Sequence, residues 1–286
     1  MSEEDVALRG GQHALTACRK GEDRRSGGGR RRISAIVPVF NEEKTVSGVV
    51  QALLQSNLIH EVICVNDGST DGSLAILQAL ADRIELIDLQ NNRGKGHALT
   101  VGIKRSSGEI VAFFDADLTN LSGDYIRMLL TPILQGDARA VLGYPVVAPL
   151  TGERAYYRAD LLPHLDRMAE TGFGAEMFLN SLFDREEVAT IRLRGLKALL
   201  KHEKHGAVKA VQEYLGAGIE IAQEIARREG LLAVDKQIIA GLKSVTSLQM
   251  LKKTVERVQS PLLKRILKEY VIQYIEMIEG YWRESD

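Results

Sequence analysis

The stretch Ile33-Ser-Ala-Ile-Val-Pro-Val-Phe40 decides the fold, because it is a short apolar, β-branched run with the length of a buried strand. Three similar runs follow, each bounded by Gly, Asn or Asp, at residues 60–66, 84–89 and 109–114. Stretches of helix length with apolar residues at three- and four-residue spacing lie between them, at 42–55, 71–81 and 94–106. Strand followed by helix, four times, predicts an α/β fold with a mainly parallel sheet flanked by helices.

The rest of the chain divides into three predicted regions. Residues 1–32 are polar, contain the run RRSGGGRRR from Arg24 to Arg32, and are interpreted as a flexible basic tail. The sheet domain covers residues 33–206, with a further strand at 138–147, a turn at 149–152, helices near 160–170 and 175–183, and a strand near 188–193. Residues 207–286 are predicted to form a helical C-terminal extension whose apolar stripe covers the sheet domain or pairs two subunits, a possible homodimer. That stripe consists of Val211, Leu215, Ile219, Ala222 and Ile225.

Composition excludes several classes of protein. The 286 residues include 37 Lys and Arg against 38 Asp and Glu, so the net charge of −1 gives no overall field that would attract nucleic acid. Two cysteines, Cys18 and Cys64, cannot form a disulfide framework or a zinc ligand set, which favours a reducing compartment. No apolar stretch reaches the roughly 18 to 20 residues that span a bilayer, and no apolar leader is evident at the start. We therefore expect a cytoplasmic protein with at most peripheral membrane contact.

Acidic residues follow three of the predicted strands. The first strand runs into Asn41-Glu42-Glu43, the second into Asp67-Gly-Ser-Thr-Asp71 and the fourth into Asp115-Ala-Asp117. The carboxyl ends of parallel strands share one edge of a sheet, where ligands bind. Asp115 and Asp117 are two residues apart, so in extended chain they project from one face and can share Mg²⁺ or Mn²⁺. Such an ion neutralises a pyrophosphate leaving group.

Single residues exclude three well-known ligand-binding loops. A calcium loop starting at Asp67 needs a bidentate Glu at its twelfth position, which is Gln78. The segment Asn92-Arg-Gly-Lys-Gly96 offers flexible backbone and two cations for a diphosphate, but Gly96 stands where the P-loop needs Ser or Thr. The dinucleotide fingerprint needs glycines directly after the first strand, where this chain has Asn41-Glu42-Glu43.

Four motifs in order resemble those of the family 2 nucleotide-sugar glycosyltransferases, over roughly residues 33–200. They are Ile36-Val-Pro-Val-Phe-Asn-Glu42, Val65-Asn-Asp-Gly-Ser-Thr-Asp71, Asn91-Asn-Arg-Gly-Lys-Gly-His-Ala98 and Phe113-Phe-Asp-Ala-Asp117. The pattern is most similar to polyprenyl-phosphate sugar transferases and glucosyl-3-phosphoglycerate synthase-like enzymes. The resemblance implies a Rossmann-like GT-A fold and a divalent metal, Mg²⁺ or Mn²⁺, in the transfer of a sugar from a nucleotide diphosphate.

The resemblance also implies roles for individual residues on the donor side. Residues of the nucleotide-sugar site would be Pro38, Val39, Phe40, Glu42, Asp67, Lys95, Asp115 and Ala116. Among these, Asp67 would contact the base or ribose, Lys95 would lie near the base or phosphate, and Asp115 would contact the ribose or share the metal. Asp117 would be the principal metal ligand and thereby catalytic.

On the acceptor side the resemblance rests on two further segments. Thr151-Gly-Glu-Arg-Ala-Tyr-Tyr-Arg158 resembles an acceptor loop and the helix after it, so Gly152, Glu153 and Arg154 would bind the acceptor. An exposed helix start is the competing interpretation for its arginines. Glu176, in Gly172-Phe-Gly-Ala-Glu176, would face the donor sugar or act as base, or be an ordinary helical Glu.

Some relatives complete the metal site with a His after the last core strand, and the resemblance puts Ala198 at the matching position of this chain. His202 is then the candidate metal ligand and His205 its neighbour.

These observations lead to one expectation and two alternatives. We expect a metal-dependent enzyme that moves one sugar from a UDP- or GDP-sugar to an anionic small molecule or a polyprenyl phosphate. The signature Gln-x-x-Arg-Trp of chain-building synthases is absent from the sequence. If the reaction inverts, Glu176 would deprotonate the acceptor hydroxyl, and retention stays open. The alternatives are a nucleotidyltransferase acting on a sugar phosphate and a sugar-nucleotide-binding scaffold without turnover.

Overall fold

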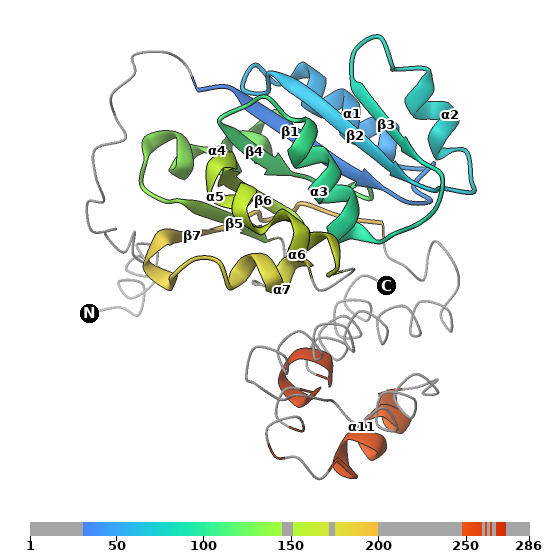
Figure 1. Cartoon of the computed structure of the whole chain (residues 1–286), viewed down its shortest axis with the longest axis vertical. Helices are drawn as coiled ribbons and strands as arrows, with labels where there is room; N and C mark the ends of the chain where they lie inside the picture. The colour runs from blue at the N-terminus through green and yellow to red at the C-terminus, as the bar shows by residue number, and fades with distance from the viewer. Residues whose placement is uncertain are drawn as a thin grey trace, which may run out of the picture.

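The computed structural model describes residues 31–144, 151–171, 175–199 and 248–258, residues 261 and 264, and residues 267–272. Its centre is a seven-stranded sheet with strand order β3-β2-β1-β4-β6-β5-β7 (Figure 1). The strands are β1 (Ile33–Val39), β2 (Glu61–Asp67), β3 (Glu85–Leu89), β4 (Ile110–Phe113), β5 (Ala140–Tyr144), β6 (Glu153–Tyr157) and β7 (Val188–Arg192). The mainly parallel, helix-flanked sheet predicted from the sequence is confirmed.

The first four strands are all parallel and alternate with helices. β1 pairs with β2 and β4, and β2 pairs with β3. The helices after them are α1 (Val46–Gln55), α2 (Ser73–Gln78), α3 (Lys95–Arg105) and α4 (Gly123–Gln135). Each of the first three begins later than its predicted stretch, because the residues after β1, β2 and β3 form turns that lead into the helix.

Two apolar clusters cover the two faces of the sheet. One packs side chains of α1 and α4, such as Val49 and Leu129, against alternate residues of β1, β2 and β4. The other packs Leu99 of α3 and Phe178 of α7 (Ala175–Asn180) against the opposite face. Because strand side chains alternate between faces, this three-layer arrangement accounts for the continuously apolar strands in the sequence.

The second half of the sheet corrects one prediction. Residues 151–158 were expected to be a loop followed by a helix start, but residues 153–157 form β6, antiparallel to both β4 and β5. Helix α5 (Arg158–Leu161) starts only after this strand ends. Ala155 and Tyr156 are buried between the neighbouring strands, so packing against β4 and β5 outweighs the local resemblance to a helix start.

The predicted helix at 160–170 is broken into three short pieces. They are α5, the 3₁₀ turn η1 (Leu162–His164) and α6 (Leu165–Ala169). Pro163 lies in this stretch, and a proline inside a helix removes a hydrogen bond and clashes with the preceding turn. The 3₁₀ turn η3 (Arg185–Glu187), which has a capping box at Asp184, then leads into β7.

The last two residues of the predicted basic tail, Arg31 and Arg32, contact the sheet domain. Arg31 Nη1 donates to Tyr157 Oη at 2.7 Å and to the carbonyl of Ile133 at 3.0 Å, and its guanidinium lies over the Tyr157 ring. Arg32 Nη2 donates to Ser107 Oγ at 3.2 Å. The last two arginines of the predicted tail are therefore bound to the sheet domain. Residues 1–30 lie outside the described residues.

Part of the C-terminal extension is described as α11 (Leu248–Glu256) and a π-helical turn, η4 (Leu267–Ile272). Glu256 forms ion pairs with Lys264 and Lys268 at 2.6 Å each. The predicted apolar stripe between Val211 and Ile225 lies outside the described residues. Among the described helices, none has both the length and the apolar character needed to cross a bilayer.

Candidate active site

The carboxyl ends of β2, β1 and β4 lie next to one another, because these strands are neighbours in the sheet. The order of strands reverses between β1 and β4, since the chain builds β2 and β3 on one side of β1 and β4 on the other. Ligands of open α/β sheets bind in the crevice at such a reversal. The acidic residues predicted from the sequence are therefore brought to one edge.

The turns after β1 and β2 are tied together by polar contacts. Asn41 adopts a left-handed φ of 57°, and its Oδ1 accepts from the N–H of Thr70 at 2.8 Å. The N–H of Glu42 donates to Ser73 Oγ at 2.8 Å, and Glu43 Oε2 accepts from the N–H of Gly72 at 2.7 Å. Because these side chains satisfy backbone groups of the neighbouring turn, the edge has a defined shape before any ligand binds.

Asp67 is held by the backbone of the next turn. Its Oδ1 accepts from the N–H of Arg93 at 2.9 Å, and its Oδ2 accepts from the N–H of Gly94 at 2.8 Å. The residue is only 3% exposed. Its predicted contact with a base or ribose stays a prediction, and the interactions within the protein are to the turn that precedes Lys95.

Lys95 lies between two carboxylates from different parts of the chain. Its Nζ is 2.7 Å from Asp115 Oδ1 and 2.6 Å from Glu176 Oε1. Burial by itself would lower the pKa of Lys95, but the charges of Asp115 and Glu176 outweigh burial and raise it above its ordinary value. The structure thus brings together three residues predicted separately from the sequence, one each from α3, the end of β4 and α7.

Asp117 lies beside the strand-like segment that follows β7. The N–H of Leu199 donates to the carbonyl of Asp117 at 2.7 Å, and Ala198 pairs with Leu118 in an antiparallel bridge. His202 and His205 lie outside the described residues. In the described part of the chain no group of three or more His, Cys, Asp or Glu residues is arranged to hold a metal ion.

Gly152 is opposite Asp115, because the register of β4 and β6 pairs Phe113 with Arg154. A Cβ on Gly152 would be 2.0 Å from Asp115 Oδ2, far inside contact distance. The absence of a side chain therefore allows the Asp115 carboxylate to lie against the backbone of β6. This gives Gly152 a role in placing Asp115, while its predicted contact with an acceptor stays a prediction.

Glu153 is buried, with 4% of its surface exposed. Its Oε2 lies 2.6 Å from Thr151 Oγ1, and that hydroxyl also contacts the carbonyl of Gly143. The Thr151 hydroxyl is the donor in its contact with Glu153. Burial raises the pKa of Glu153 to about 8, and the negative charge of Asp115 adds to the rise.

Arg154 is 1% exposed, which contradicts its interpretation as an exposed arginine at a helix start. Its Nη1 donates to Asn180 Oδ1 at 2.6 Å and to Tyr156 Oη at 3.1 Å, and its Nε donates to the carbonyl of Thr151 at 2.6 Å. Asn180 was not predicted, although it stands four residues after Glu176 and so on the same face of α7. Arg154 thus helps to hold α7, and its role toward an acceptor stays a prediction.

The remaining residues predicted to bind the nucleotide sugar differ in which of their atoms a ligand could contact. Val39 and Ala116 are buried with their side chains in the apolar core, so a ligand could meet only their backbone atoms. Phe40, at the end of β1, is 44% exposed. It is an aromatic surface at the acidic edge, whereas Pro38 is partly buried.

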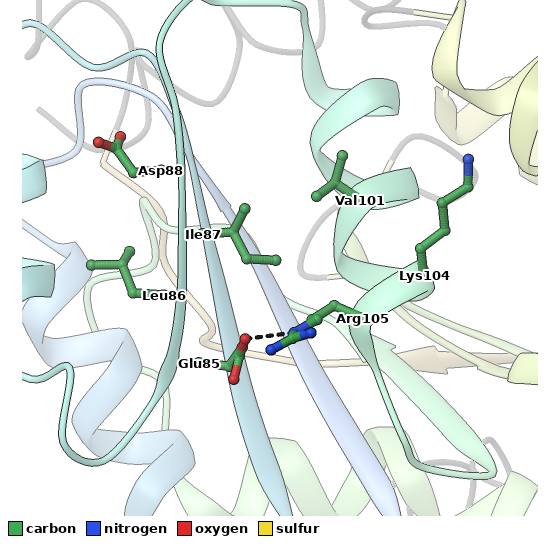
Figure 2. Close-up of a pocket in the computed structure, with 7 residues that line it drawn as sticks. All are labelled: Glu85, Leu86, Ile87, Asp88, Val101, Lys104 and Arg105. Atoms are coloured by element: carbon green, nitrogen blue, oxygen red, sulfur yellow. Dashed lines mark hydrogen bonds and ion pairs between the residues drawn. The ribbon is translucent and has the colours of Figure 1, made fainter.

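An open groove of about 530 Å³ lies elsewhere, between β3 and the C-terminal part of α3 (Figure 2). It is lined by Glu85, Leu86, Ile87, Asp88, Val101, Lys104 and Arg105, and Glu85 accepts from Arg105 Nε at 2.6 Å. Since a helix rises about 1.5 Å per residue, Arg105 is roughly 15 Å along α3 from Lys95. The groove is therefore separate from the acidic edge.

The sequence model of Glycosyl transferase family 2 matches residues 34–187, more than half of the 286-residue chain. The protein belongs to this family. The resemblance seen in the four sequence motifs is thereby confirmed. The matched region includes every described member of the site, from the end of β1 to α7.

Two curated relatives are similar to part of this glycosyl transferase family 2 chain. The undecaprenyl-phosphate 4-deoxy-4-formamido-L-arabinose transferase of Pseudomonas aeruginosa is 32% identical over 130 residues, 43% of this chain and 36% of that protein. The glucosyl-3-phosphoglycerate synthase of Mycobacterium tuberculosis is 32% identical over 116 residues, 37% of this chain and 35% of that protein. The chain thus spans about a third of the length of the curated relatives it matches.

Solved structures agree with the family assignment. A crystal structure of the M. tuberculosis glucosyl-3-phosphoglycerate synthase has a TM-score of 0.52 at 25% identity, and covers 67% of this chain and 81% of that one. A structure of the same synthase with Mn²⁺, uridine diphosphate and glucosyl-3-phosphoglycerate has a TM-score of 0.50 at 25% identity, covering 65% and 80%. The likeness supports the predicted GT-A fold.

Proposed function

We propose that the protein transfers a single sugar from a UDP- or GDP-sugar to an anionic acceptor with the help of a divalent metal. One observation carries the proposal. The carboxylates of Asp115 and Asp117 end a buried strand at the reversal of the sheet, and Asp115 is linked through Lys95 to a third carboxylate, Glu176. The family and the arrangement of charge point to the same chemistry.

The donor would occupy the edge formed by β1, β2 and β4. The exposed ring of Phe40 offers a face on which a nucleobase can stack. Glu42, with Pro38 and the backbone of Val39 and Ala116, would line the same pocket. Lys95, when it turns from one of its carboxylates, supplies a cation for the diphosphate.

The donor set of the site suits Mg²⁺ or Mn²⁺. Both are hard cations that take carboxylate oxygens, and Mg²⁺ is commonly held by one or two carboxylates together with substrate phosphates. Asp117 and Asp115 would supply those oxygens, with His202 as a further candidate. When bound, the ion neutralises the departing diphosphate. The synthase structure that contains Mn²⁺ together with uridine diphosphate supports this choice.

Glu176 would act on the acceptor. If the acceptor presents a hydroxyl, the Glu176 carboxylate would take its proton, and displacement would invert the sugar carbon. If the acceptor presents a phosphate, its oxygen is already a nucleophile and Glu176 would only orient it. Lys95 holds Glu176 near Asp115, which supports an acceptor side next to the donor side.

The class of acceptor is inferred from the relatives. One is named for an undecaprenyl-phosphate acceptor and the other for a phosphoglycerate product, so both names include an anionic phosphate. Arg154 is the cation assigned to this acceptor, with Glu153 beside it in β6 and Gly152 directly before that strand. Contact with a ligand would require Arg154 to give up part of its bonding to Asn180.

Four broader predictions complete the proposal. They are the domain boundaries at residues 32 and 206, pairing of two copies through the C-terminal extension, at most peripheral contact with a membrane, and a cytoplasmic location. None is needed for the chemistry at the acidic edge.

Calorimetric titration with UDP, GDP, CDP and dTDP, each with and without Mn²⁺, tests the proposal. We expect one of these diphosphates to bind in the presence of Mn²⁺ and to bind much more weakly without it. Hydrolysis of the matching nucleotide sugar then separates an enzyme from a scaffold that only binds. Absence of binding to all four nucleotides, with or without the metal, would overturn the proposal.

A further inference from the structure

We propose that Asp67 is a positioning residue, which fixes the turn before α3 and thereby sets Lys95 between Asp115 and Glu176. The consequence for sugar transfer rests on the proposed function, whereas the positioning itself is a property of the free protein. The role differs from the contact with a base or ribose that the sequence resemblance implies for Asp67.

The first step is the bonding of the Asp67 carboxylate. Each oxygen accepts one backbone N–H, from Arg93 at 2.9 Å and from Gly94 at 2.8 Å. Hydrogen bonds to an ionised acceptor are about twice as strong as neutral ones. The group is 3% exposed, so these two donors account for the directions in which its oxygens point.

The second step is the close packing of the two turns. Gly68 has a φ of 70°, and a Cβ there would lie 2.6 Å from the N of Asn92 and 2.7 Å from the carbonyl carbon of Asn91. The turn after β2 and the turn after β3 are thus in backbone contact beside the Asp67 bonds. No side chain can be inserted between them without moving one turn.

The third step leads to Lys95, which is the first residue of α3 and directly follows Gly94. Gly94 has a φ of 90° and is the N-cap position of the helix, without a side-chain cap. The Asp67 carboxylate therefore holds the start of α3 in place of a capping side chain. Since Lys95 Nζ must reach two carboxylates at once, a shift at the start of α3 would break at least one of these contacts.

Amide hydrogen exchange in the free protein gives the first test. In the wild type, the amides of Arg93 and Gly94 should exchange slowly although the Arg93 side chain is on the surface, and Asp67→Asn should speed their exchange by about tenfold or more. Asp71→Asn is the matched control. Asp71 also accepts two backbone N–H groups, from Glu43 and Ser73, but in a different turn. Fast exchange of both amides in the wild type would overturn the proposal even if the variant does not fold.

Acetylation of lysine amines, followed by mass spectrometry, gives the second test. Lys95 should react slowly in the wild type and about tenfold faster in Asp67→Asn, because an amine freed from its carboxylates is more accessible and more often neutral. Lys104, on the same helix and 58% exposed, should react at the same rate in both proteins. An unchanged rate at Lys95 in a folded variant would contradict the proposal. Neither test uses a ligand, so both stand if the proposed function fails.

Nucleotide binding separates positioning from direct contact. With Mn²⁺ and whichever of UDP or GDP binds, Asp67→Asn should weaken the diphosphate several-fold but leave the corresponding nucleoside monophosphate within about twofold. In a Lys95→Met background the same substitution should add little further loss, because the residue it acts through is gone. Equal weakening of both nucleotides, retained in that background, would show that Asp67 contacts the nucleoside and would overturn the positioning role.

Discussion

The two halves of the sheet build the site in different ways. In the half formed by β1 to β4, parallel strands end in turns whose side chains bond the backbone of neighbouring turns, as Asp67 does with the turn before α3. In the half formed by β5 to β7, the antiparallel strand β6 lies between β4 and β5. It contributes buried polar groups at Glu153 and Arg154, and Gly152, directly before it, leaves room for Asp115 because it has no side chain.

The difference shows where the site depends on both halves. The first half supplies Asp115, Asp117 and Lys95, whereas Glu176 is attached to the second half through α7. Within the site, the two halves are joined by the ion pair of Lys95 with Glu176 and by the packing of Asp115 against Gly152. We therefore expect substitutions at these two contacts to have different effects from substitutions at groups that belong to one half alone.

Asp117→Ala should have the largest effect, because it removes a carboxylate of the first half that the proposed function assigns to the metal. We expect loss of Mn²⁺-dependent nucleotide binding and a drop in transfer of at least about a hundredfold. Titration calorimetry with and without Mn²⁺ measures the first, and a transfer assay measures the second. Asp124→Ala, an exposed acid of α4 paired only locally with Arg127, is the control and should bind normally. Full activity of Asp117→Ala would refute the metal assignment.

Gly152→Ala should disrupt the contact between Gly152, directly before β6, and Asp115, which follows β4. The added methyl would have to displace the Asp115 carboxylate from its contact, and we expect a loss of about 1–3 kcal/mol in the free energy of unfolding together with weaker metal-dependent nucleotide binding. Gly48→Ala is the matched control, because nothing lies within 4 Å of a Cβ there. In the interior of α1 it should stabilise by up to about 1 kcal/mol. Urea unfolding gives the free energy of unfolding of both variants. Equal changes in the two variants would show that Gly152 has no packing role.

Prediction from sequence succeeded where local pattern and tertiary structure agree. The runs at β1 to β4 are apolar, β-branched and bounded by turn residues, so their type and order could be predicted, and the acidic edge followed from the rule that parallel strands end together. Asp115 and Asp117 were placed correctly at the end of β4 for this reason.

Prediction failed where long-range contacts decide the structure. Tyr156 and Ala155 form a strand because β4 and β5 lie on either side of them, and the pairing with β4 joins segments that are far apart in the sequence. The link of Lys95 to Glu176 joins residues 81 positions apart, and no spacing rule covers such a pair. The raised pKa of Glu153 also depends on burial that only the folded sheet provides.

Lys95→Met and Glu176→Gln test the other contact between the two halves, the ion pair of Lys95 with Glu176. Their effects on stability should be unequal. Without Lys95 two carboxylates, Asp115 and Glu176, lose their shared cation, and we expect a loss of about 2 kcal/mol or more. Glu176→Gln leaves Lys95 paired with Asp115 and should cost about 1 kcal/mol. Chemical denaturation gives both values. Lys104→Met, whose exposed partner Asp166 is 3.7 Å away, should stay within about 0.5 kcal/mol of the wild type. A larger loss for Glu176→Gln than for Lys95→Met would contradict this arrangement.

Glu153→Gln should have the smallest effect at low pH, because the oxygen of a neutral amide can accept from Thr151 as the carboxyl oxygen does. With a pKa of about 8 in the folded protein against an ordinary 4.5, Glu153 binds its proton more tightly folded than unfolded. Its contribution to stability is therefore fully present below about pH 4.5 and is lost as the pH rises toward 8. Unfolding titrations from pH 5 to 8 should show Glu153→Gln gaining stability relative to the wild type as the pH increases. A constant difference across this range would show that folding does not raise the pKa of Glu153.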